Sequence, residues 1–67
     1  MIHGVIEEFD ADTGVGYLRD DGGERFFFHC VAIEDGTRRI DVGAHATGER
    51  AVGHLGRDEV VAVRRFA

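Results

Sequence analysis

The sequence has 67 residues, which allows one small domain and leaves little room for a large hydrophobic core. Thirteen acidic residues face eight basic ones, all of them arginine, and the net charge of −5 argues against long-range attraction to nucleic acid. No apolar run approaches a membrane-spanning length, no secretory signal pattern opens the chain, and a single cysteine cannot form an internal disulfide. We therefore expect one soluble, cytoplasmic domain over residues 1–67, with no membrane association.

Short apolar segments separated by glycine predict strands, because no segment shows helical periodicity and the chain has no proline. The predicted strands cover residues 3–9, 16–20, 24–30, 44–52 and 59–66. The "DDGG" of residues 20–23 predicts a tight hairpin, "GHLGR" at 53–57 joins the last two strands, and residues 32–39 form a longer connection with one short helical turn. This pattern predicts an all-β domain, a five-stranded antiparallel barrel that is closed or nearly closed.

The third predicted strand, "ERFFFHC", contains half of the aromatic residues of the chain, which has five phenylalanines and one tyrosine. Because side chains alternate between the two faces of a strand, Phe26 and Phe28 share one face, and Phe27 and His29 share the other. The first face suits the core, which leaves Phe27 exposed and in need of an explanation. The residues predicted to be buried are Ile6, Phe9, Leu18, Phe26, Phe28 and Ile33.

The hairpin is expected to bring the second strand beside the outer side chains of the third. The predicted outer aromatic face consists of Tyr17, Phe27 and His29, with Val15 and Cys30 beside them. Bases of single-stranded nucleic acid stack on such side chains at roughly 1–3 kcal/mol per base, whatever their sequence. Gly14 and Gly16 are expected to leave room for a nucleic-acid strand to approach the backbone.

Two motifs resemble those of cold shock domains. "TGVGYL" at 13–18 resembles their first nucleic-acid motif, K-G-(F/Y)-G-(F/Y)-I, and "FFFHC" at 26–30 is similar to their second, V-F-V-H-(F/Y). The opening "HGVIEEFD" is similar to the G-x-V-(K/R)-W-(F/Y) start of the family, and the resemblance covers nearly the whole chain. It implies a five-stranded OB-type barrel that binds single-stranded RNA or DNA and acts as an RNA chaperone or gene-expression regulator.

The resemblance also implies which residues bind nucleic acid. Carried over by position, they are Val15, Tyr17, Phe27, His29, Cys30, Arg38 and Arg57. Val15 and Cys30 replace aromatic residues, Glu8 stands where a tryptophan is usual, and Thr13 replaces a lysine. We therefore predict weakened affinity, and phosphates can be held only if arginines such as Arg25, Arg38, Arg39 and Arg57 flank the face.

The fourth strand departs from the family as well. Ala46, Gly48 and Arg50 stand where the resemblance implies three large apolar residues. A smaller core and a change of strand register both remain open.

Other functional classes have less support. Histidines 3, 29, 45 and 54 and Cys30 lack metal-ligand spacing, so we predict no metal site and no cofactor. A small open sheet also offers no pocket for a Cys–His pair, so we predict that the chain is not an enzyme. The alternative to nucleic-acid binding is a diverged barrel for protein interaction or self-association, with monomer and dimer both open.

Overall fold

The structure, a computed structural model, describes residues 1–34, 36–53 and 58–65 and folds them into a closed barrel. The strands are β1 (Ile2–Asp10), β2 (Val15–Asp20), β3 (Arg25–His29), β4 (His45–Val52) and β5 (Asp58–Arg65). All of the predicted strands are confirmed, with their ends close to the expected residues. The short helical turn is the 3₁₀ turn η1 (Cys30–Ala32), which begins earlier than expected and takes Cys30 out of β3.

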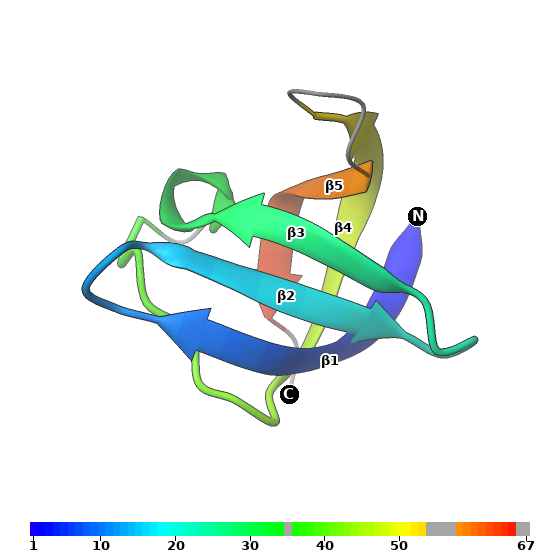
Figure 1. Cartoon of the computed structure of the whole chain (residues 1–67), viewed down its shortest axis with the longest axis horizontal. Helices are drawn as coiled ribbons and strands as arrows, with labels where there is room; N and C mark the ends of the chain where they lie inside the picture. Colours follow the sequence, from blue (N-terminus) through cyan, green and yellow to red (C-terminus); the bar gives the residue numbers. More distant parts are fainter. Residues whose placement is uncertain (35, 54–57, 66–67) are drawn as a thin grey trace.

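The strands follow the order β1-β2-β3-β5-β4 around the barrel, and β4 pairs with β1 to close it. In Figure 1, β1, β2 and β3 lie side by side in front, while β4 and β5 pass behind them. All pairings are antiparallel except that of β3 with β5, which is parallel and joins Phe27 to Glu59. Closure removes the long free edges that so small a sheet would otherwise expose.

The predicted hairpin between β2 and β3 is confirmed, and Asp20 organises it. Its carboxylate Oδ1 accepts hydrogen bonds from the backbone N–H groups of Gly22 at 2.9 Å and Glu24 at 2.8 Å. Gly23 has a φ of 90°, which glycine adopts without steric cost. The turn therefore fixes the register in which the two strands pair.

The core lies between the front strands and the strands behind them. Its buried members are Ile6, Leu18, Phe26, Phe28, Ile33, Ile40, Ala46, Val60 and Val63. Five of the six residues predicted to be buried are in this set, whereas Phe9 is only half-buried. Phe9 packs at the margin of the core, where its ring stacks on Phe28 with centroids 6.0 Å apart.

Both explanations that the sequence left open for the fourth strand apply to β4. Ala46 and Gly48 are buried, and a Cβ at Gly48 would collide with a methyl group of Val60, so the core is locally smaller. The register with β5 also shifts, beside Ala62 with its φ of 53°. Arg50 lies outside the core, and its guanidinium donates to Asp58 Oδ1 at 3.1 Å.

Two further predictions concern the connections and the membrane. Residues 54–57, which make up most of the predicted connection "GHLGR", lie outside the described residues. Within the part of the chain that the structure describes, no helix has the length and apolarity needed to cross a membrane.

Candidate nucleic-acid interface

The pairing of β2 with β3 gathers the predicted aromatic face. Val15 pairs with His29, and Tyr17 pairs with Phe27. Cross-strand partners lie on the same face of a sheet, and the neighbours of these residues along both strands are buried in the core. The outer face of the β2–β3 hairpin therefore carries Val15, Tyr17, Phe27 and His29 together, as predicted.

The prediction that Phe27 is exposed is wrong. Only 9% of Phe27 is accessible, although it lies outside the core cluster. Its ring contacts Tyr17 edge-on, with centroids 5.6 Å apart, and His29 in the same manner at 4.9 Å. The neighbouring rings therefore cover the ring on the outer face, which leaves the half-buried Tyr17 and the exposed His29 as the accessible rings.

Gly16 and Cys30 do not serve the aromatic face as predicted. A Cβ at Gly16 would lie 2.5 Å from the carbonyl oxygen of Glu8 and 2.8 Å from Cζ of Phe28. Gly16 is thus buried beneath β1 and makes room for a core ring rather than for nucleic acid. The Cys30 side chain packs against the core, so it is not part of the outer face.

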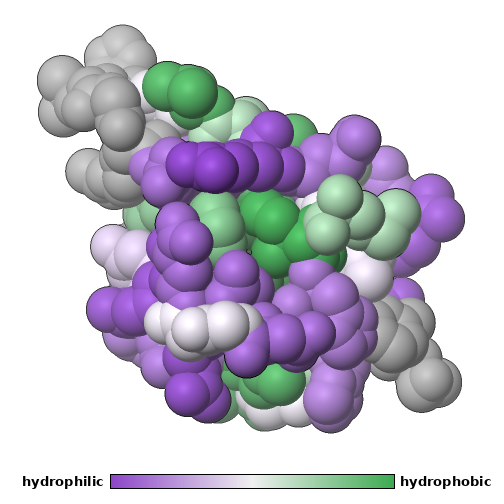
Figure 2. Space-filling view, turned by 90° about the vertical axis from the view of Figure 1, so that its right-hand side faces the viewer, coloured by the Kyte–Doolittle hydropathy of each residue, from purple (hydrophilic) through white to green (hydrophobic). Residues whose placement is uncertain are grey.

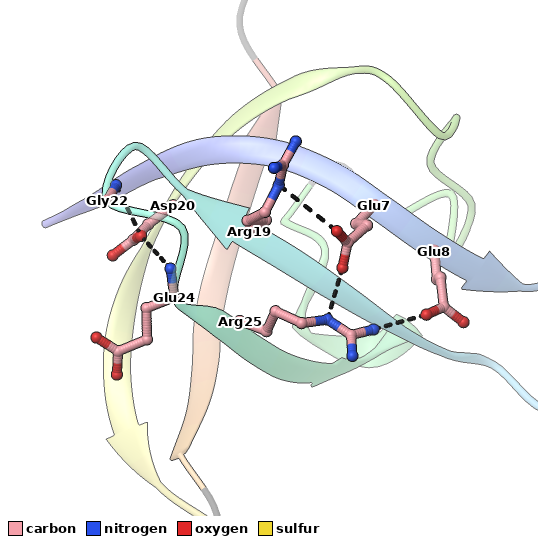
Figure 3. Close-up of polar contacts among 7 residues, drawn as sticks. All are labelled: Glu7, Glu8, Arg19, Asp20, Gly22, Glu24 and Arg25. Atoms are coloured by element: carbon pink, nitrogen blue, oxygen red, sulfur yellow. Dashed lines mark hydrogen bonds and ion pairs between the residues drawn. The ribbon is translucent and has the colours of Figure 1, made fainter.

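Ion pairs extend the outer face toward the β2–β3 turn. Arg19 and Arg25 lie opposite each other on β2 and β3, where two like charges would repel. The Glu7 carboxylate lies between them, with Oε2 3.5 Å from Nε of Arg19 and Oε1 2.5 Å from Nε of Arg25. Figure 3 shows the second pair of Arg25, in which Nη2 donates to Glu8 Oε2 at 2.6 Å. The two acidic residues therefore neutralise arginines on the outer face.

A β-bulge explains how two consecutive glutamates reach the same guanidinium. Between Ile6 and Glu8 the register of β1 with β2 shifts, and Glu7 is the extra residue. In a regular strand Glu7 and Glu8 would point to opposite faces, but the bulge turns both outward while Ile6 stays buried and Phe9 packs on the core. The sequence analysis did not predict this bulge. The feature that could have indicated it is the pair Glu7 and Glu8, two adjacent charged residues in a strand whose side chains otherwise alternate between inside and outside.

The structure places the arginines proposed to hold phosphates in different surroundings. Arg25 lies beside Tyr17 but is engaged by Glu7 and Glu8. Arg38 and Arg39 are exposed on the connection before β4. Arg57, another predicted contact, lies outside the described residues.

The side of the molecule with the amino terminus and the β2–β3 turn is mostly hydrophilic, and apolar side chains show at its centre and in smaller areas near its upper and lower margins (Figure 2). On β4, the hydrogen bond to Asp58 and its negative charge raise the pKa of Arg50.

Among residues 1–34, 36–53 and 58–65, no three histidine, cysteine or acidic side chains lie together as metal ligands.

Comparisons with known proteins identify the family. The chain is 33% identical over 57 residues to Cold shock protein 2 of Lactiplantibacillus plantarum, covering 84% of this chain and 86% of that protein. It is 32% identical over 57 residues to Cold shock protein CspD of Bacillus subtilis, again covering 84% and 86%. No protein-family model matches.

A solved structure agrees on the fold. The structure of drosophila Unr CSD456 matches 98% of this chain and 26% of that chain, with a TM-score of 0.80 and 22% identity. The closed barrel, the paired motifs on β2 and β3 and the curated relatives together show that the chain is a diverged member of the cold shock protein family.

Proposed function

We propose that the chain binds single-stranded RNA or DNA weakly through the outer face of the β2–β3 hairpin. Membership of the cold shock family implies nucleic-acid binding in general. The observation that supports this surface is the register of β2 with β3, which places Val15 and Tyr17 opposite His29 and Phe27. Exposed rings on a sheet stack with bases of any sequence, which suits the RNA-chaperone or gene-regulatory roles that the resemblance implies.

Weak binding follows from what this face lacks. Phe27 is nearly covered, Val15 has no ring, and the guanidinium of Arg25 is already paired with carboxylates. The net charge of −5 adds no long-range attraction. Single-strand affinity falls with log salt at a slope of about −0.7 per phosphate neutralised, so few available arginines imply a shallow slope.

A titration tests the proposal. A short, fluorescently labelled single-stranded oligonucleotide is titrated with the protein at low and at moderate salt, and binding is followed by anisotropy. His29→Ala removes an exposed ring from the outer face, and His45→Ala removes an exposed ring from β4 as the matched control. We expect the first to lower affinity roughly tenfold, the value of one stacked base, and the second to leave it unchanged. Nanomolar affinity with a steep salt slope, or equal effects of the two variants, would contradict the proposal.

Protein interaction or self-association stays the alternative prediction. Sedimentation of the free protein over a range of concentrations tests the self-association part of it. A dimer that forms without oligonucleotide, together with no detectable oligonucleotide binding, would put this alternative first.

A further inference from the structure

Arg25 covers the ring of Tyr17. The guanidinium carbon Cζ lies over the ring, 4.3 Å from its centroid, which is a cation–π contact. Tyr17 pairs with Phe27 and Arg25 pairs with Arg19, so the contact joins diagonal neighbours on the outer face. A base that stacks on this side of the ring needs the space that the guanidinium occupies.

Two carboxylates hold the guanidinium in this place. Glu7 pairs with its Nε at 2.5 Å and Glu8 with its Nη2 at 2.6 Å. We call these two ion pairs, together with the stacking on Tyr17, the Arg25 clamp. The clamp depends on the bulge of β1, since only there do both carboxylates face outward. The clamp consists of four side chains from three strands. Figure 3 draws Glu7, Glu8 and Arg25 but not Tyr17.

We propose that the Arg25 clamp masks Tyr17 and that a single-stranded nucleic acid binds by displacing it. The inference rests on the function proposed above and names the residue that limits the affinity. The Arg25 side chain is 46% exposed and that of Glu8 is 64% exposed, so their ion pair is weak and water can reach the guanidinium, whereas Glu7 is less exposed, at 34%. A phosphate beside the ring then replaces the carboxylates as the partner of Arg25, while a base takes its place on Tyr17.

The clamp can be observed without any ligand. The chain has one tyrosine and no tryptophan, so tyrosine fluorescence reports on Tyr17 alone. Glu8→Gln keeps the shape of the side chain but removes its charge, and Arg25→Ala removes the cover itself. We expect acrylamide to quench Tyr17 fluorescence more strongly in both variants than in the parent protein. Unchanged quenching in both would show that no clamp exists in solution and would overturn the proposal.

Oligonucleotide binding then separates unmasking from a general loss of negative charge. Glu24→Gln is the matched control. Glu24 is exposed and precedes Arg25 in the sequence, but among the described residues the carboxylates that pair with the Arg25 guanidinium are those of Glu7 and Glu8. Glu8→Gln should raise the affinity for the oligonucleotide above that of Glu24→Gln, because it loosens the cover on Tyr17. The gain should be only about three- to tenfold, since exposed ion pairs are individually weak. In the Arg25→Ala background, the advantage of Glu8→Gln over Glu24→Gln should disappear.

The possible failures are distinct. Equal affinities of Glu8→Gln and Glu24→Gln, or an advantage that persists in the Arg25→Ala background, would overturn the masking role and leave the proposed function intact. No binding by the parent or by any variant, even with Tyr17 uncovered, would overturn the proposed function and the masking role with it.

Discussion

The two faces of the β2–β3 hairpin are built from the same strands but are ordered by different forces. On the inner face, Leu18, Phe26 and Phe28 are buried in one apolar cluster. On the outer face, rings contact one another edge-on, and a guanidinium bound by two carboxylates lies over one of them. Hydrophobic burial holds the inner face, whereas short-range charge and ring contacts hold the outer one.

This difference shows where the chain can change without losing its fold. Side chains on the inner face must fill a closed volume, and neighbours from β1, β4 and β5 constrain each of them. Side chains on the outer face touch water on one side, so a ring or a charge there can be exchanged at lower cost. We therefore expect substitutions on the outer face to change stability less than substitutions on the inner face.

The largest expected effect comes from the inner face. Phe28→Ala removes a fully buried ring and leaves a cavity, which should cost about 3–5 kcal/mol of unfolding free energy. A single small core rarely supplies more than about 3–5 kcal/mol, so this variant should be largely unfolded. Urea denaturation followed by circular dichroism checks this. A cooperative transition near that of the parent would show that the core tolerates the loss.

Phe27→Ala is the matched change on the outer face and should have a smaller effect. Because Phe27 is only 9% accessible, its removal costs the transfer free energy of the ring, about 1.5–3 kcal/mol. No closed cavity forms, since water can enter the outer face. Because the Phe27 ring is nearly covered, it offers little surface to a base, so the oligonucleotide affinity of the folded fraction should fall less than the roughly tenfold expected for His29→Ala. If this variant unfolds as readily as Phe28→Ala, the two faces do not differ in the way described.

Strand alternation allowed the inner face to be predicted from sequence. The period of two in "RFFFH" assigns Phe26 and Phe28 to one side, and the motif spacing pairs Tyr17 with Phe27. The turn was also readable, because Asp20 and the glycines after it suit a tight hairpin. These features depend on neighbours in the sequence, so a sequence pattern records them.

The outer face was predicted less well, because its order depends on contacts between strands. Alternation places Phe27 on the outside but does not show how far Tyr17 and His29 cover it. The Arg25 clamp needs the extra residue Glu7 in β1, and a bulge reverses the alternation after it. Cys30 follows His29 directly, so alternation itself places it on the core side, where it packs.

Gly16→Ala tests how closely the inner face is packed. The added Cβ would meet the Glu8 carbonyl and the ring of Phe28, and overpacking of this kind costs about 1–3 kcal/mol. Gly22→Ala is the control, since its Cβ would lie 3.5 Å from Oδ1 of Asp20, an ordinary van der Waals contact. We expect a lower urea midpoint for the first variant and little change for the second. Equal midpoints would mean that β1 and Phe28 move aside without cost.

The smallest expected effect on stability belongs to the Arg25 clamp. Glu8→Gln removes one exposed ion pair, which should cost less than about 1 kcal/mol at low salt. The Debye length falls to about 3 Å at 1 M salt, so sodium chloride should abolish most of this difference. Urea denaturation is the suitable measurement, because guanidinium chloride would itself screen the charges, and Glu24→Gln again serves as the control. The deficit of Phe28→Ala should persist in high salt, since hydrophobic burial is not screened. A deficit of Glu8→Gln that is unchanged in 1 M salt would show that packing, rather than charge, orders the outer face.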